Sequence, residues 1–315
     1  FYDGQRPVGG MTGMLSSLVG RQADDVCRSK NLTKQMLEAA GMPTPAGIAL
    51  DPDQLDEALT HLRAVGRPSV LKPSTGHGGA GITCGIASED ELRSAWETAQ
   101  RAVGTNPTFV LEDQLGGVDI RMYVVGRRVV AAATRINAHV IGDGRHGIAE
   151  LVELKNKVRA KNVFLAKRGM ISVDTALLTR DGRTLDDVPK ADEVVVLNSI
   201  SNQHVGGENV DVTELVHPDL RRLAVDAVRA VPGLGTAGVD LLAPDVRSAD
   251  GAVVLELNTK ANIRVHHQPA YGRPRDVAGA IVDEMIAKAG EPVRNPTRGT
   301  GIARRAIRRL LRPQR

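Results

Sequence analysis

Two carboxylates and an amide occur on two strands predicted near the end of the chain. Asp240 lies in GVDLLAPD, and VVLELN contains Glu256 and Asn258 two residues apart. Alternate residues of a strand share a face, so Glu256 and Asn258 point the same way. Leu255 and Leu257 are then expected to face a core. Oxygen ligands of this kind suit Mg²⁺, which prefers one or two carboxylates plus phosphate oxygens. An exposed polar face of an antiparallel sheet is the alternative.

A glycine-rich loop follows an apolar run that ends in a lysine. The stretch VLKPSTGHGGAGI places Lys72 at the end of a short strand, before Gly76, Gly78, Gly79 and Gly81. Such backbone exposes N–H groups to phosphate oxygens, and a lysine adds a compact positive charge. We interpret Lys72 and residues 74–81 as a flap over a nucleotide triphosphate. A flexible surface hairpin is the alternative, because neither a Walker loop nor a Rossmann fingerprint is present.

A third group of charged residues lies on a predicted hairpin. In VLEDQLGGVDIRMYV, the residues Asp119, Arg121 and Tyr123 alternate with apolar residues and are predicted to share one face. Arg135 follows on the paired strand, in VVAAATR. A carboxylate and arginines on one face of an apolar hairpin indicate a functional face, with an exposed surface ion pair as the alternative.

The elements that must position these residues mix helices and strands. Helices are predicted over residues 30–40, 53–65, 88–103, 148–157, 218–231 and 275–289. Ser29 is expected to cap the first of these, and Ser88 with Glu91 to form a capping box on the third. Strands are predicted over residues 68–73, 82–86, 108–114, 118–125, 128–135, 236–243 and 252–258, and residues 160–217 are expected to be irregular. The absence of strict βαβ alternation favours α+β lobes.

Composition limits the class of protein. The chain has 315 residues, 42% hydrophobic and 25% charged, which is ordinary for a globular chain of one to three lobes. With three Phe, three Tyr and one Trp it offers few platforms for base stacking, so no nucleic-acid partner is expected. No apolar run reaches the ~18 residues of a membrane span, and the N-terminus does not resemble a signal peptide. Cys27 and Cys84 follow no disulfide or metal spacing. We therefore expect a cytoplasmic protein.

The formal net charge of +4 arises from a basic tail. After Pro292 the chain contains eight arginines and no acidic residue. Apolar residues of GIARRAIRRLLRPQR recur at helical spacing, which predicts an amphipathic helix that lies on an anionic surface, docks on a partner or supports a homo-oligomer. A poorly ordered terminus is the alternative.

The order of these motifs resembles the ATP-grasp superfamily, over roughly residues 4–290. The resemblance rests on SKNLTKQMLEAAGMPTP, VLKPSTGHGGAGI, VLEDQLGGVDIRMYVVGRRVVAAATRI, HVIGDGRHGIAELVELKN, DGRTLDDVP, HVGGENVDVTELVHPD and GVDLLAPD with VLELN. Within the superfamily, the chain is most similar to the ATP-grasp domains of cyanophycin synthetases and bifunctional glutathione synthetases.

The resemblance implies an α+β ATP-grasp fold in which two lobes hold ATP between them. Its implied parts are a partial N-terminal segment over 1–29, a lobe with the flap over 30–115, a lobe with the metal site over 116–290, and the basic tail over 291–315.

The resemblance also implies a role for each matching residue. Lys30 and Lys72 contact ATP phosphates, and Asn202 lies near the triphosphate. The flap contains Gly76, Gly78, Gly79 and Gly81. Glu112 and Leu115 hold adenine, and Asp119 holds the ribose. Arg121 and Arg135 stabilise the transferred phosphate and the substrate carboxylate. Two Mg²⁺ ions are held by Asp240, Glu256 and Asn258.

The implied reaction is ATP-dependent ligation of a carboxylate to an amine. The carboxylate becomes an acyl phosphate, and an amine from an amino acid or short peptide then displaces phosphate. The sequence is compatible, because it has no GxSxG nucleophile elbow. An ATP-grasp kinase and a nucleotide-binding scaffold without turnover are the alternatives.

Two features depart from the superfamily pattern. Only 29 residues precede Lys30, where relatives carry a whole domain. The residues after Asn258 read TKANIRVHH, where relatives have small residues and proline. Lys260 and Arg264 are therefore candidates to bind a substrate carboxylate, with a solvated basic face as the alternative. His266 and His267 are expected to form hydrogen bonds within a loop.

Overall fold

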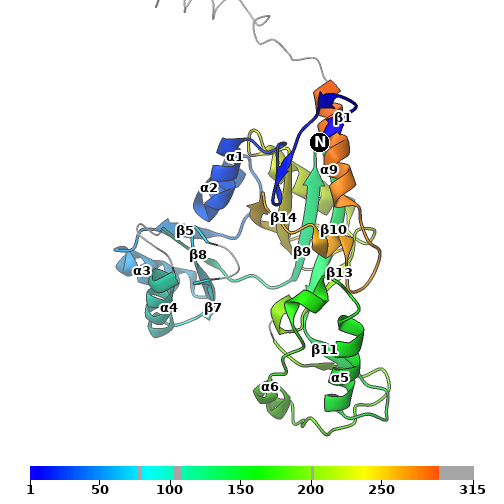
Figure 1. The fold of residues 1–315 in the computed structure, drawn as a ribbon. Helices are drawn as coiled ribbons and strands as arrows, with labels where there is room; N and C mark the ends of the chain where they lie inside the picture. The colour runs from blue at the N-terminus through cyan, green and yellow to red at the C-terminus, as the bar shows by residue number, and fades with distance from the viewer. Residues whose placement is uncertain (77–79, 103–107, 200–201, 291–315) are drawn as a thin grey trace, which may run out of the picture.

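Two antiparallel sheets of four and five strands carry the fold (Figure 1). The computed structural model describes residues 1–76, 80–102, 108–199 and 202–290. The smaller sheet has the order β5-β8-β6-β7, with strands β5 (Gly47–Leu50), β6 (Ser69–Pro73), β7 (Thr83–Ile86) and β8 (Phe109–Asp113). The larger sheet has the order β13-β10-β9-β14-β15, with strands β9 (Val118–Val125), β10 (Arg128–Ile136), β13 (Glu208–Asp211), β14 (Thr236–Ala243) and β15 (Val253–Asn258). This mixture of helices and antiparallel sheets confirms the predicted α+β class.

Helices pack on each of the two sheets and in an insertion between β10 and β13. They are α1 (Arg21–Arg28), α2 (Lys30–Ala39), α3 (Leu55–Val65), α4 (Glu89–Ala102), α5 (Ile148–Arg159), α6 (Thr175–Arg180), α7 (Pro218–Arg229), α8 (Arg264–His267) and α9 (Val277–Gly290). The six predicted helices are confirmed as α2, α3, α4, α5, α7 and α9, whereas α1, α6 and α8 were not predicted. The capping box of α4 is also confirmed, because Ser88 N donates to Glu91 Oε2 at 3.0 Å and Glu91 N donates to Ser88 Oγ at 3.3 Å.

The smaller sheet has its own core beneath α3 and α4. Leu71 and Leu111 are fully buried there. Trp96 of α4 packs edge-on against Phe109 of β8, with ring centroids 4.8 Å apart. Aromatic pairs in this arrangement contribute about 0.5–1.5 kcal/mol beyond the area they bury. The packing fixes β6 and β8, the two strands that carry Lys72 and Glu112.

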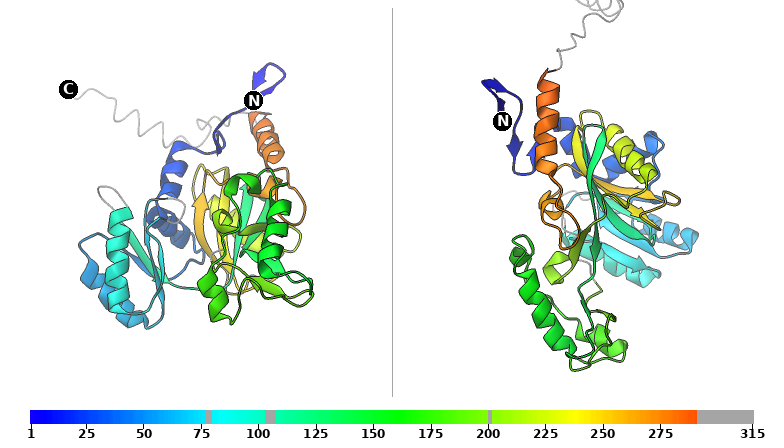
Figure 2. Two further views of the ribbon diagram at one scale, coloured as in Figure 1. Left: turned by 60° about the horizontal axis from the view of Figure 1, so that its bottom comes forward. Right: turned by 90° about the vertical axis from the view of Figure 1, so that its right-hand side faces the viewer.

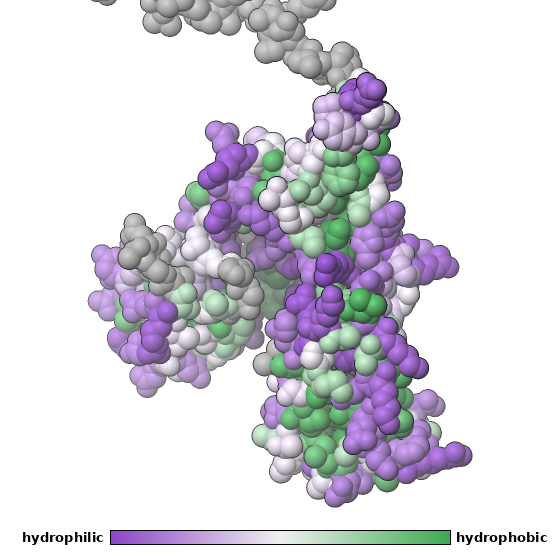
Figure 3. Space-filling view, viewed as in Figure 1, coloured by the Kyte–Doolittle hydropathy of each residue, from purple (hydrophilic) through white to green (hydrophobic). Residues whose placement is uncertain are grey.

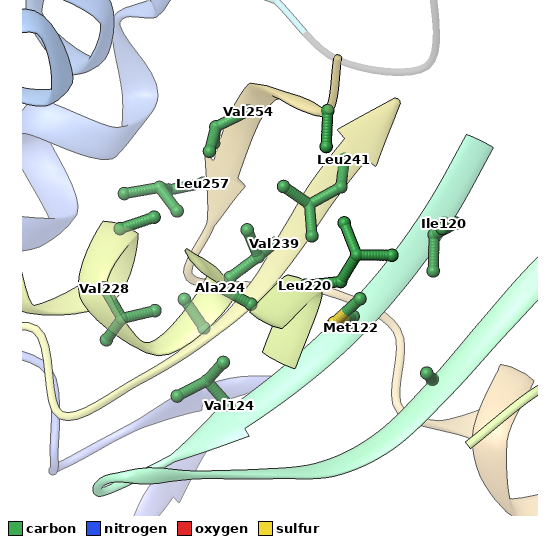
Figure 4. Close-up of a cluster of buried hydrophobic side chains, with 14 of the residues drawn as sticks. Ile120, Met122, Val124, Leu220, Ala224, Val228, Val239, Leu241, Val254 and Leu257 are labelled. Carbon is green, nitrogen blue, oxygen red and sulfur yellow. The ribbon is translucent and has the colours of Figure 1, made fainter. Parts of the chain in front are cut away.

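The larger sheet has a different core on each face. Ile120, Met122 and Val124 of β9 are buried against α7, where Leu220 lies among them (Figure 4). Tyr123, which lies between Met122 and Val124 in the sequence, is buried on the other face of the sheet against α9. Figure 2 shows α7 and α9 on opposite sides of this sheet. The predicted alternation along residues 118–125 is therefore confirmed, and it directs the polar residues of β9 to the α9 side.

Helices α1 and α2 pack with the larger sheet. Ala23 and Leu37 lie in the same buried cluster as Leu257 of β15. Helix α1 was not predicted, and its eight residues, RQADDVCR, are too few for a period to repeat more than about twice. Tertiary packing of an amphipathic face supplies most of the stability of so short a helix.

The remaining short elements lie in two places. Residues 1–16 form two small hairpins, β1 (Tyr2–Asp3) with β2 (Arg6–Pro7) and β3 (Met11–Thr12) with β4 (Leu15–Ser16). An insertion between β10 and β13 contains α5, α6, β11 (His139–Ile141), β12 (Val194–Val196) and the 3-10 turns η1 (Leu165–Arg168) and η2 (Gln203–Val205). The expectation that residues 160–217 are irregular was therefore partly wrong. Within the described residues, every helix is too short or too polar to cross a membrane.

Candidate functional site

The N-terminus of α2 is bound to the start of the glycine-rich loop. Ser29 caps α2 as predicted, since its Oγ accepts a hydrogen bond from Leu32 N at 3.2 Å. The loop residue Ser74 accepts from Lys30 N through its carbonyl at 2.7 Å and from Asn31 N through its hydroxyl at 3.2 Å. These bonds hold the N-terminus of α2 beside the start of the glycine-rich loop, where the positive end of the helix dipole favours an anion.

Lys30 connects this loop to the acidic edge of the larger sheet. Its Nζ lies 3.4 Å from the carbonyl oxygen of Gly76 and 3.9 Å from Glu256 Oε2. Lys34, one turn later on the same face of α2, was missed by sequence reasoning, although the i, i+4 spacing from Lys30 could have indicated it. Lys34 and Lys30 both line a narrow pocket between the two sheets, together with Lys72 and Glu112. Four charged residues, three of them predicted site residues, therefore line one space. The Lys34 ammonium group is already paired there with Glu38 at 3.1 Å.

Lys72 and Glu112 form a buried ion pair across β6 and β8. The residues are 9% and 6% exposed, and Lys72 Nζ contacts Glu112 Oε1. Removing two charges from water costs several kcal/mol per ion, so such a pair is weak evidence for stability. Both residues line the pocket between the sheets.

Two of the predicted metal ligands, Asp240 and Glu256, lie opposite each other in the larger sheet, and Asn258 lies opposite Gly238. The strand register pairs Asp240 of β14 with Glu256 of β15 and with Arg121 of β9. Arg121 donates two hydrogen bonds to the Asp240 carboxylate, one from each of two guanidinium nitrogens. Burial, and then repulsion from Asp240, raise the pKa of Glu256, while Lys30 and Arg121 oppose the shift. The sheet thus holds two carboxylates together that would repel each other without a cation.

A β-bulge changes the local alternation of β15. The pairing steps from Glu256 to Val254, so Leu255 is the extra residue. Val254 and Leu257 enter the core, whereas Leu255 lines the pocket between the sheets. The prediction that Leu255 and Leu257 share the core face was therefore wrong for Leu255, because one inserted residue reverses the side on which the preceding residues project.

A second arginine–carboxylate pair lies farther along the same hairpin. Arg135 Nη2 contacts Asp119 Oδ2, and strand β13 places Asn209 opposite Arg135. Burial raises the pKa of Asp119, and Arg135 opposes this shift. Because Asp119, Arg121 and Arg135 come from adjacent strands with their pairs on one face, the structure brings together the charged residues predicted on this hairpin.

Other predicted residues make different contacts. Leu115 is 38% exposed at the connection between the sheets. Asn202 caps η2, because its Oδ1 accepts from His204 N at 2.9 Å. Gly76 and Gly81 have φ angles of +135° and +73°, which favour glycine, while Gly78 and Gly79 lie outside the described residues.

The candidate substrate residues after Asn258 differ from each other. Lys260 Nζ lies 3.4 Å from Asp24 Oδ2, and Asn258 Oδ1 accepts from Lys260 N at 2.9 Å. Arg264 is exposed at the start of α8.

The two histidines that follow differ in their surroundings. The expectation that His266 forms a hydrogen bond within a loop was wrong, because the ring is buried and neither ring nitrogen has a hydrogen-bond partner. Burial lowers the pKa of His266 to about 3, so the ring is neutral. His267 forms a hydrogen bond, accepting at Nε2 from Ala278 N at 3.1 Å, but the bond joins α8 to α9 and does not lie within a loop.

The donor set fits Mg²⁺ bound together with phosphate. Among the described residues, no three Asp, Glu, His or Cys side chains converge as a metal cluster. Mg²⁺, however, usually binds one or two carboxylates plus substrate phosphates. The carboxylates of Asp240 and Glu256, the amide oxygen of Asn258 and the nearby lysines provide these parts.

A larger cavity of about 330 Å³ lies in the insertion, between α5 and Tyr271. Its rim includes Ile141, Leu154 and Val158, which are 44–66% exposed. Figure 3 shows hydrophobic residues gathered over this lower part of the molecule. None of the predicted site residues lines the cavity, so the candidate site is the polar space between the sheets.

Known proteins resemble the chain along most of its length. A family profile described as a RimK-like ATP-grasp domain matches residues 27–185. Cyanophycin synthetase of Trichormus variabilis is 36% identical over 285 residues, covering 88% of this chain and 31% of the relative. Glutathione biosynthesis bifunctional protein GshAB of Pasteurella multocida is 29% identical, covering 83% of this chain and 35% of the relative. The chain thus spans about a third of the length of these relatives.

Solved structures agree with the sequence matches. The bifunctional glutathione synthetase from Pasteurella multocida superposes with a TM-score of 0.66 and 27% identity, over 88% of this chain and 38% of that one. D-alanine–D-alanine ligase from Bacillus anthracis, at 17% identity, has a TM-score of 0.50 over 86% of this chain and 70% of that one, and shows the fold alone. With a profile over half its length and a relative at 36% identity, the chain has the ATP-grasp fold and belongs to the RimK-like ATP-grasp family.

Proposed function

We propose that the chain is an ATP-dependent carboxylate–amine ligase that forms an amide or peptide bond between amino acids, or with a short peptide. The observation that carries the proposal is the position of Lys30. Its Nζ lies within 4 Å of both the Gly76 carbonyl and the Glu256 carboxylate. One cation therefore lies between the glycine loop and the carboxylate of Glu256. A triphosphate with bound Mg²⁺ would need both the loop and the carboxylate.

The proposed reaction has two steps. The γ-phosphoryl group of ATP passes to a carboxylate oxygen of the donor, the bond to ADP breaks, and an acyl phosphate forms. The acceptor amine then attacks the acyl carbon, the new C–N bond forms, and phosphate leaves with its electron pair while the amine loses a proton to solvent. No covalent bond to the protein is needed, so catalysis rests on positioning and charge stabilisation.

The side chains divide this work. Lys30 and Lys72 bind phosphate oxygens, while Arg121 and Arg135 orient the transferred phosphoryl group and the substrate carboxylate. Asp240, Glu256 and Asn258 hold two Mg²⁺ ions. Bound Mg²⁺ supplies several kcal/mol of charge stabilisation.

The remaining assignments concern adenosine, the triphosphate and the substrate. Glu112 and Leu115 hold adenine, and Asp119 holds the ribose. Asn202 and the glycines of the loop contact the triphosphate. Because Lys260 is paired with Asp24, Arg264 is the better candidate for a substrate carboxylate. We place the reaction in the cytoplasm, on small amino-acid or peptide substrates.

Trapping with hydroxylamine tests the reaction class. The protein is incubated with ATP, Mg²⁺ and single amino acids or dipeptides, and phosphate release and hydroxamate are measured. A ligase yields a hydroxamate with the donor alone, because hydroxylamine replaces the amine on the acyl phosphate. A stable phosphorylated product without hydroxamate would indicate a kinase, and ATP binding without ADP release across the screen would indicate a scaffold.

Deleting residues 292–315 is expected to leave ligation intact. The tail follows α9, whose buried residues pack on the larger sheet, and the proposed site uses no residue beyond Arg264. We expect kcat/KM within about twofold of the full chain, since changes remote from a site are usually small. Solubility or assembly is expected to change if the tail supports a homo-oligomer, which light scattering measures. A folded truncated protein without activity would place the tail in the active site.

A further inference from the structure

Asp24 is a buried carboxylate that contacts the loop directly after the proposed metal ligands. It lies on α1 and is 5% exposed. Its Oδ1 accepts a hydrogen bond from Thr259 Oγ1 at 2.5 Å, and its Oδ2 lies 3.4 Å from Lys260 Nζ. One carboxylate thus holds two successive residues that are 235 and 236 positions away in the sequence.

The same loop is bound to Asn258. Lys260 N donates to Asn258 Oδ1 at 2.9 Å, so the orientation of the proposed amide ligand depends on the position of Lys260. Thr259, the residue between them, is 4% exposed, and its hydroxyl has little access to water. If Asp24 were removed, this hydroxyl would lose its acceptor, and an unsatisfied buried donor costs about 1–3 kcal/mol.

Core packing fixes Asp24 itself. The preceding residue, Ala23, is 1% exposed and lies in the same cluster as Leu257 of β15. Helix α1 is therefore held against the strand that carries Glu256 and Asn258. The Lys260 side chain is half-exposed, so Asp24 is what restrains its ammonium group.

We propose that Asp24 is a positioning residue of the metal site, which sets the orientation of Asn258 by holding Thr259 and Lys260. This inference rests on the proposed metal site. It gives α1 a function that the motif pattern did not indicate. It also accounts for the sequence TK after Asn258, because a hydroxyl and an ammonium group are the partners that a buried carboxylate needs.

The chain offers a matched control on the same helix. Asp25 follows Asp24, but its side chain is half-exposed and pairs with Arg21 at 2.9 Å. An exposed i, i+4 pair contributes about 0.3–0.5 kcal/mol. Asp25→Ala therefore removes the same charge from α1 without touching the loop after Asn258.

The test measures metal binding directly, with Mn²⁺ as the probe in the presence of ADP, followed by electron paramagnetic resonance. We expect Asp24→Ala to weaken Mn²⁺ binding about tenfold or more, the usual range for residues that orient a ligand. Asp24→Asn keeps an acceptor for Thr259 and should weaken Mn²⁺ binding less. Asp25→Ala should leave Mn²⁺ binding unchanged, and ADP binding without metal should be unchanged in all three variants.

Further variants keep the outcomes distinct. Thr259→Val removes the hydroxyl without changing the shape, so it tests the contact if Asp24→Ala does not fold, and it should also weaken Mn²⁺ binding. A folded Asp24→Ala or Thr259→Val protein with unchanged Mn²⁺ affinity would reduce Asp24 to a structural tether and overturn the inference. Glu256→Gln is measured in parallel. If it too leaves Mn²⁺ affinity unchanged, the proposed metal site is wrong and the inference falls with it.

Discussion

Replacing Glu256 by Gln should lower Mg²⁺-dependent turnover at least ~100-fold without destabilising the fold. A metal clamp contributes several kcal/mol, and each 1.36 kcal/mol is a factor of ten in rate. Glu256 lies opposite Asp240 in the sheet, and its closest cation, Lys30, is 3.9 Å away. The substitution therefore removes the repulsion between Glu256 and Asp240 and loses only the weak ion pair with Lys30. The free energy of unfolding should equal or exceed that of the original chain. Phosphate release over a magnesium titration and denaturant unfolding measure the two effects.

The variant Asp240→Asn should lose activity to a similar degree but should also lose stability. Asp240 accepts both hydrogen bonds of Arg121, and a partly buried guanidinium without its carboxylate is costly. Glu97→Gln, on the exposed surface of α4, controls for removal of a charge. Near-normal activity of either site variant across the magnesium titration would show that the metal site is wrongly placed.

The predictable parts of the fold are those with a strong local period. The hairpin of β9 and β10 follows from two-residue alternation, and its polar face follows with it. The α1 helix and the short elements of the insertion were not predictable in the same way. The eight residues of α1 span only about two turns, and the helix becomes stable by packing Ala23 into a distant core. Elements of three to six residues, such as α6 and β12, are too short to show a period.

The candidate site shows the same limit. Residue type and order indicated Lys72, Asp240 and Glu256, because their chemistry is unusual beside apolar strands. The side of the sheet on which Leu255 projects was predicted wrongly, because a β-bulge depends on how two strands pair. Asp24 was missed because its partners lie 235 and 236 residues away, and no local pattern indicates such a contact. Sequence therefore indicated the charged groups better than the contacts that orient them.

Replacing Lys72 by Met should weaken ATP binding strongly and also destabilise the smaller sheet. Lys72 is the partner of Glu112, and both residues are buried. Breaking a buried pair by removing one partner typically costs about 3–5 kcal/mol, because the other charge is left uncompensated. A loss of ATP affinity in this variant alone would therefore not distinguish a phosphate contact from damage to the fold. Equilibrium unfolding and nucleotide affinity must be measured on the same preparation.

The double variant Lys72→Met with Glu112→Gln separates the two effects. Removing both charges leaves no uncompensated ion, so most of the lost unfolding free energy should return, as it does when a buried pair is replaced by neutral residues. ATP affinity should stay below that of Glu112→Gln alone, because the positive charge beside the glycine loop is still missing, while the change at Glu112, which is assigned to adenine, is common to both variants. With Glu112→Gln alone, the fold should be less impaired than with Lys72→Met, since a buried amide still accepts a hydrogen bond from Lys72. If the double variant regains both stability and ATP affinity, Lys72 supports only the sheet, and the phosphates must be bound elsewhere.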